Sequence, residues 1–132
     1  MTLRWYTVVV DCEDNASQAR WWADVLGWPI VYEALDEVVI VPPHALTEGA
    51  ARIPREERGQ GLVFVPVPEG KTVKNRLHLD LAPGPDDDQA AEVDRLIAKG
   101  ATRVEVGQRD DAAWVVLADP EGNEFCVLSP RD

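Results

Sequence analysis

Residues 115–128 read VVLADPEGNEFCVL, in which two apolar runs flank a short polar segment. Runs of β-branched and aromatic residues bounded by turn-forming residues are typical of strands. Between the runs, Asp119 can hydrogen-bond its own backbone, Pro120 fixes the next φ angle, and Gly122 tolerates a positive φ. The stretch therefore predicts a β-hairpin whose second strand carries Cys126.

A strand followed by an amphipathic helix is predicted near the start of the chain. Residues 3–10 are rich in Trp, Tyr, Thr and Val, which favour a strand. Asp14 or Asn15 can cap the helix that follows, and Gly27 can adopt the left-handed conformation that ends it. We expect three more strands in this half, at residues 29–33, 37–41 and 62–65. The polar stretch 42–61 exceeds the usual loop length, which is typical of a lid, a binding loop or a mobile segment.

The second half repeats this order of elements. Residues 74–82, KNRLHLDLA, alternate as a strand does, and the helix after them has Asp86 as its expected cap and Gly100 at its end. Three more strands are expected at residues 102–106, 114–118 and 124–128. When the halves are laid on each other, Asp11 falls opposite Asp80. A weak internal repeat of this kind predicts two modules that form one domain.

Composition limits both the class of protein and its partners. The chain has 132 residues, 45% of them hydrophobic and 28% charged, which suits a single globular domain spanning 1–132. A net charge of −11 argues against nucleic acid and anionic membranes, which require clustered cations. We expect a cytoplasmic protein, since no membrane span or signal-peptide pattern is present. Cys12 and Cys126 lie within apolar runs and are expected to be buried thiols.

Three stretches, residues 7–30, 61–83 and 114–128, together resemble the vicinal oxygen chelate superfamily of glyoxalases, extradiol dioxygenases and bleomycin-resistance proteins. The match is closest to its glyoxalase-like domains. The resemblance implies an α+β fold of two βαβββ modules, about 1–68 and 72–130, whose mixed sheets curl around a central cavity. It also implies a homodimer.

The resemblance also bears on whether the protein binds a metal. Metal-dependent members of the superfamily place His and Glu on the first and last strands of each module. The matching positions here hold Thr7 and Phe64 in the first half, and Arg76 and Cys126 in the second. None of these is an imidazole or a carboxylate, so no metal and no other cofactor is predicted. If a divalent metal does bind, His78 and Glu124 are the expected ligands.

The expected pocket residues follow from the alternation of side chains along strands. Residues two apart share a face, so Arg76, His78 and Asp80 would line one wall. There His78 can act as a general acid or base that Asp80 orients, or the three groups can simply satisfy one another. The expected ligand contacts are Arg76, His78, Trp5, Thr7, Phe64, Trp114 and Cys126.

Three functions fit these residues, and the sequence leaves open whether the protein is an enzyme. The favoured interpretation is a metal-independent protein that sequesters or senses an aromatic or cationic small molecule. The alternative is a metal-dependent lyase, isomerase or dioxygenase of glyoxalase type, in which His78 and either Asp80 or Glu124 carry the chemistry. The third is an interaction domain with a vestigial pocket.

Overall fold

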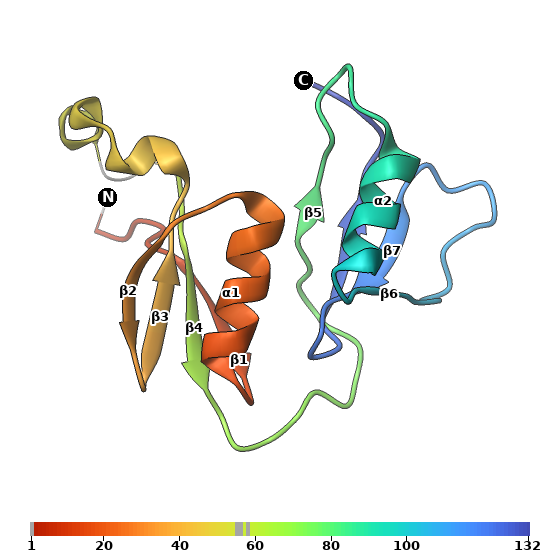
Figure 1. Ribbon diagram of the computed structural model, residues 1–132, viewed down its shortest axis with the longest axis horizontal. Helices are drawn as coiled ribbons and strands as arrows, with labels where there is room; N and C mark the ends of the chain where they lie inside the picture. Colours follow the sequence, from red (N-terminus) through yellow and green to blue (C-terminus); the bar gives the residue numbers. More distant parts are fainter. Residues whose placement is uncertain (1, 55–56, 58) are drawn as a thin grey trace. The chain divides into compact units, whose positions relative to one another are not determined.

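The computed structural model describes residues 2–54, 57 and 59–132, which divide between two compact units, Met1–Gly70 and Lys71–Asp132. Each unit contains one strand, one α-helix and three further strands in that order (Figure 1). The predicted α+β class and the repeated βαβββ order are therefore confirmed. None of the helices within the described ranges has the length and apolar character of a membrane-crossing segment.

The first unit contains a four-stranded mixed sheet in the order β1-β4-β3-β2 (Figure 1). Its elements are β1 (Val8–Cys12), α1 (Asn15–Leu26), β2 (Ile30–Ala34), β3 (Glu37–Ile40) and β4 (Leu62–Pro66). Strand β1 is parallel to β4, whereas the other neighbours are antiparallel. The predicted loop 42–61 includes two 3₁₀ helices, η1 (Pro43–Leu46) and η2 (Glu48–Arg52), and its residues 55, 56 and 58 lie outside the described ranges.

Both ends of α1 are formed by the residues that the sequence predicts. The Asp14 carboxylate accepts a hydrogen bond from the Ser17 backbone N–H at 3.1 Å, which satisfies one of the unpaired amides of the first turn. Gly27 ends the helix with φ of 68°, in the left-handed region that favours glycine. The predicted boundaries of this helix are confirmed.

The sheet of the first unit has one buried face and one open face. Cross-strand partners share a face, and the pairs Val38–Phe64 and Ile40–Leu62 are all buried. Helix α1 contacts β3 and β4, so it covers this face. On the opposite face Val9 is 54% exposed. Phe64 is therefore a core residue beneath α1.

The second unit contains another four-stranded mixed sheet, in the order β5-β8-β7-β6 (Figure 1). Its elements are β5 (Asp80–Leu81), α2 (Gln89–Ala98), β6 (Thr102–Arg103), β7 (Val115–Ala118) and β8 (Glu124–Val127). Again the first strand, β5, is parallel to the last, β8. Both cysteines are buried thiols, as predicted.

Several predicted boundaries are wrong, and strand pairing explains the differences. The strand predicted at residues 3–10 begins at Val8, because its partner β4 begins at Leu62, directly opposite. The strand predicted at 74–82 shrinks to Asp80–Leu81, since the chain bends at residues 76–77. Strand β6 likewise ends at Arg103, short of the predicted residue 106.

The cap of the second helix is also not the predicted Asp86. Asp88 caps α2, and its carboxylate accepts from the Ala90 N–H at 3.0 Å. Asp87 instead accepts from the Gly84 N–H at 3.1 Å, which closes the turn before the helix. Three consecutive aspartates offer equal capping chemistry, and only the turn geometry decides which of them reaches a free helical N–H.

The predicted β7–β8 hairpin is confirmed, and Asp119 organises its turn. One oxygen, Oδ1, accepts from the backbone N–H groups of Glu121 at 3.0 Å and Asn123 at 2.9 Å. The other, Oδ2, accepts from the Asn123 side-chain amide at 3.2 Å. Gly122 has φ of 90°, which an L side chain rarely adopts. Asp119 is 4% exposed, so these partners replace its water.

Replacement of Asp119 by alanine should destabilise the protein by about 1–3 kcal/mol, because buried turn amides lose their acceptor. The free energy of unfolding in urea measures this effect. Asp111→Ala, which removes an aspartate whose side chain is 81% exposed, is the matched control. Equal stabilities for the two variants would contradict the role given to Asp119.

Candidate functional site

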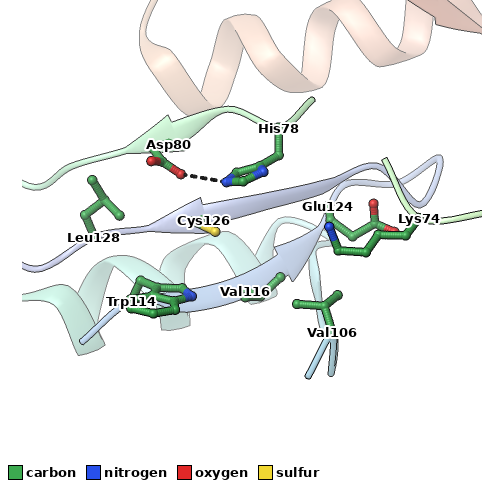
Figure 2. A pocket seen from close by; sticks show the side chains of 9 residues that line it. All are labelled: Lys74, His78, Asp80, Val106, Trp114, Val116, Glu124, Cys126 and Leu128. Carbon is green, nitrogen blue, oxygen red and sulfur yellow. Dashed lines mark ion pairs between the residues drawn. The ribbon is translucent and has the colours of Figure 1, made fainter. Parts of the chain in front are cut away.

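A pocket of about 270 Å³ lies on one face of the sheet in the second unit (Figure 2). Its lining combines an apolar wall with ionisable groups from the strands and from the segment that precedes β5. The lining residues are Lys74, His78, Asp80, Val106, Trp114, Val116, Glu124, Cys126 and Leu128. Volumes of this order are typical of sites for small ligands.

Strand alternation explains why these side chains meet. Along and just beyond β8, Glu124, Cys126 and Leu128 line the pocket, whereas the intervening Phe125 and Val127 are buried on the other side. On β7, Val116 pairs with Cys126 and so shares its face. The hairpin that the sequence predicts therefore supplies the floor of the pocket.

Three side chains with atoms that could hold a metal ion gather at the β5 side of the pocket (Figure 2). His78 Nε2 lies 3.3 Å from Asp80 Oδ1, and Asp80 pairs directly with Cys126 in the parallel ladder. One donor atom from each of the three residues lies within 4.8 Å of the other two. The thiol, the imidazole and the carboxylate thus form one polar cluster.

Burial raises the pKa of the Cys126 thiol, and the charge and hydrogen bond of Asp80 raise it further, against a smaller opposing effect of Lys74. An ordinary thiol is already protonated at neutral pH, so Cys126 remains a thiol here. A reactive cysteine requires the opposite shift. Cys126 therefore serves the pocket as a neutral group that hydrogen-bonds Asp80.

Glu124 has a different environment, although it lies on the same strand. Its Oε1 accepts from Lys71 Nζ at 2.6 Å and its Oε2 from the Asn75 backbone N–H at 2.8 Å. The Asn75 side-chain amide also donates to the Glu124 carbonyl at 3.3 Å. These contacts fasten residues 71–75 to the end of the hairpin. Glu124 is thus a structural anchor at the pocket wall.

The pKa of Glu124 reflects this anchoring. Burial alone would raise the pKa, but the hydrogen bonds from Lys71 and Asn75 and the charge of Lys71 outweigh it, and the pKa is lowered. Both partners are largely buried, with side-chain exposures of 19% for Lys71 and 13% for Glu124. The pair therefore depends on both charges being present.

Of the residues predicted in the second half, the structure brings five to the pocket and leaves one apart. The five that line the pocket are His78, Asp80, Trp114, Glu124 and Cys126, although Glu124 is not part of the donor cluster of His78, Asp80 and Cys126. Arg76 lies in the bend before β5 and is not among the lining residues, because the alternation that would align it with His78 holds only in extended chain.

The three residues predicted in the first half belong to the other unit. Trp5 precedes β1 and is 67% exposed. The Thr7 hydroxyl donates to the Gly61 carbonyl at 3.1 Å, which fastens the chain before β1 to the residue before β4. Phe64 is fully buried. A ligand contact by any of these three stays a prediction.

The structure adds pocket residues that the sequence analysis missed. Strand alternation could have predicted Val116 and Leu128, since each lies two residues from Trp114 or Cys126 along an extended chain. Lys74 and Val106 fall within the strands predicted at 74–82 and 102–106, and alternation would set Lys74 on the face of His78. Both lie in irregular segments of the structure, so alternation does not explain their place in the pocket. Lys71, the partner of Glu124, carries no such signal, because its path depends on tertiary contacts.

The ladder register also corrects the comparison of the two halves. Asp80 pairs with Cys126 on the pocket face, and the matching Asp11 pairs with Val65 on the open face of the first sheet. Val65, rather than Phe64, thus corresponds to Cys126. By the same register Val9 corresponds to His78, as the alignment of Asp11 with Asp80 already implies. Neither valine offers a donor atom to a metal.

A paired-module α+β fold with a pocket on an open sheet face defines the class of protein. The family model described as a glyoxalase-like domain matches residues 7–128, and the chain belongs to this family. This supports the predicted membership of the vicinal oxygen chelate superfamily. No curated protein matches the chain by sequence.

Solved structures show the same fold at low sequence identity. A glyoxalase/bleomycin resistance protein/dioxygenase family enzyme from Burkholderia phytofirmans is 15% identical, with a TM-score of 0.70 over 98% of this chain and 100% of that one. A glyoxalase/bleomycin resistance protein from Albidiferax ferrireducens is 21% identical, with a TM-score of 0.60 and coverages of 96% and 98%. The fosfomycin resistance protein FosX from Listeria monocytogenes, in complex with Mn(II) and sulfate, is 9% identical, with a TM-score of 0.69 and coverages of 99% and 93%.

The Mn(II) complex of FosX raises the question of whether this site suits the same ion. The donors that lie together here are an imidazole, a carboxylate and a thiol, from His78, Asp80 and Cys126. Manganese prefers oxygen-rich sites, whereas thiolate ligands select softer ions such as zinc. The donor set therefore does not fit manganese, and a thiophilic ion is the one that these three residues would hold.

Replacement of Glu124 by glutamine should reduce stability at pH 7 by about 1–2 kcal/mol, because the Lys71 ammonium loses its partner. The folded-state pKa of Glu124 lies below its ordinary value of 4.5. The carboxylate thus stabilises the fold above the unfolded-state pKa, and this contribution is lost as pH falls through the folded-state pKa. Urea unfolding from pH 7 to pH 3 should show the variant and the wild type converging in acid.

The control is Glu105→Gln, which changes an exposed carboxylate in the same unit. It should leave stability nearly unchanged at every pH. A Glu124→Gln deficit that stays constant down to pH 3 would show that the ionised carboxylate is not the stabilising group.

Proposed function

We propose that the protein binds a small aromatic ligand that carries a positive charge or a hydrogen-bond donor, so that it sequesters or senses this molecule. The observation that carries the proposal is the pocket itself. Its aromatic and aliphatic wall of Trp114, Val116 and Leu128 faces the polar cluster that contains Asp80 and His78.

The apolar wall supports an aromatic ligand. Trp114 is only half-buried, so part of its ring remains for contact with a planar group. The valine and leucine side chains beside it add apolar surface without competing for hydrogen bonds. A flat ligand is therefore favoured over a fully polar one.

The polar cluster supports a cationic or donor group on that ligand. The Asp80 side chain is 48% exposed, and each carboxylate oxygen has more than one lone pair. Asp80 can therefore accept a further hydrogen bond beside its contacts with His78 and Cys126. Cation–π attraction to Trp114 favours the same charge.

Binding through these groups requires no metal. His78, Asp80 and Cys126 already serve as one another's partners, and the pocket-facing acid Glu124 is occupied by Lys71 and Asn75. The second candidate is a metal-dependent lyase, isomerase or dioxygenase of glyoxalase type. The approach of three donor atoms to within 4.8 Å favours it, and there Asp80 would orient His78 as a general acid or base.

The binding proposal is tested with benzamidine and its uncharged analogue benzamide, by thermal shift and calorimetric titration. A ligand that binds only the folded state raises its melting temperature. Benzamidine should bind more tightly than benzamide, and Trp114→Leu should weaken both by about five- to tenfold, as expected for a lost stacking contact.

Asp80→Asn should reduce the preference for benzamidine, because it removes the negative charge at the polar end. Asp94→Asn, an exposed position on α2, is the matched control and should behave as the wild type does. Binding that is unchanged in both Trp114→Leu and Asp80→Asn would place the ligand outside this pocket.

The metal-independent mode predicts that benzamidine binds equally well before and after dialysis against EDTA. Loss of binding on chelation, with recovery on added Zn²⁺, would favour the metal-dependent candidate. Titration with Co²⁺ gives an independent readout, since a cobalt–thiolate bond produces a charge-transfer absorption that Cys126→Ser would abolish. The absence of this band at equimolar Co²⁺ is the expected result.

A further inference from the structure

We propose that the ligand is dipolar, with an anionic group on Lys74 in addition to the donor or cation at Asp80. This inference rests on the proposed function, since it concerns the chemical class of the molecule in the same pocket. A zwitterionic aromatic acid is the simplest molecule of this class.

The first observation is that Lys74 contributes a cation to the pocket and has no anionic partner in the part of the chain that the structure describes. Its side chain lines the cavity, and its Nζ has one weak hydrogen bond, to the Asn75 carbonyl at 3.5 Å. Within residues 2–54, 57 and 59–132, no carboxylate forms an ion pair with this ammonium. A surface lysine is commonly solvated in this way, so the groups around Lys74 decide whether its charge is available to a ligand.

Those surroundings contain two carboxylates, and each has partners other than Lys74. Glu124 uses one oxygen for Lys71 and the other for Asn75. Asp80 interacts with His78 and Cys126. The segment 71–75 therefore places one lysine in an internal ion pair and the next one at the pocket, where its charge remains available to a ligand.

The second observation is the separation of the two charges along the pocket. Figure 2 shows Asp80 toward one end of the pocket and Lys74 beside Glu124 toward the other, with His78 and Cys126 between them and with Trp114 and Val116 on the side of β7. A ligand with one charge at each end of an apolar body matches this order. A purely cationic ligand would leave Lys74 unsatisfied and repelled.

The experiment compares aromatic amines with and without a carboxylate, by calorimetric titration of the full chain. Benzylamine carries the cation alone, whereas 4-(aminomethyl)benzoate and the longer 4-(2-aminoethyl)benzoate carry both charges. At least one of the two zwitterions should bind about five- to tenfold more tightly than benzylamine, as expected for one partly desolvated ion pair.

Lys74→Met should remove this preference and slightly raise the affinity for benzylamine, because the repelling ammonium is gone. Lys74→Arg keeps the charge and should retain the preference. Circular dichroism checks that both variants fold, as expected for an exposed side chain.

The outcomes separate this inference from the proposal on which it rests. If benzylamine binds as tightly as both zwitterions, or if the preference survives in Lys74→Met, the dipolar ligand is ruled out while the aromatic pocket stands. If no aromatic probe binds at all, both proposals fail. Binding that depends on Trp114 and on Lys74 together supports both.

Discussion

The parallel pairing of β5 with β8 is the constraint on which the candidate site depends. It consists of few hydrogen bonds, among them those from the Cys126 N–H to the Leu79 carbonyl at 3.0 Å and from the Leu128 N–H to the Leu81 carbonyl at 2.8 Å. A parallel ladder joins segments that are distant in sequence, here by more than 40 residues. Without it, Asp80 would not meet Cys126, and the pocket would lose its polar side.

The polar groups of the site divide between structural and available ones, and this division shapes its chemistry. The Glu124 carboxylate pairs with the Lys71 ammonium, and Cys126 remains a protonated thiol beside Asp80. What remains for a ligand is the exposed part of the half-buried Trp114, the spare acceptor capacity of Asp80 and the ammonium of Lys74. This remainder favours recognition of a small molecule over nucleophilic chemistry by the thiol.

Sequence reasoning succeeded where local physical chemistry decides the structure. The cap of α1, its glycine end and the β7–β8 turn each depend on residues a few positions apart, and all three are as predicted. His78, Asp80, Trp114 and Cys126 came from strand alternation and resemblance, and they do meet in one pocket. Alternation failed for Arg76, because the chain there bends and the period of two no longer applies.

The sequence by itself determined the α+β class, the two repeated modules and the hairpin that carries Cys126, because periodicity, capping and turn chemistry act over short distances. Only the tertiary structure decided which sheet face is open and that Val65, rather than Phe64, corresponds to Cys126. It also decided that the Glu124 carboxylate pairs with Lys71. These features depend on ladder register and on the path of irregular segments. Both are set by contacts between distant residues, for which a single sequence holds no local signal.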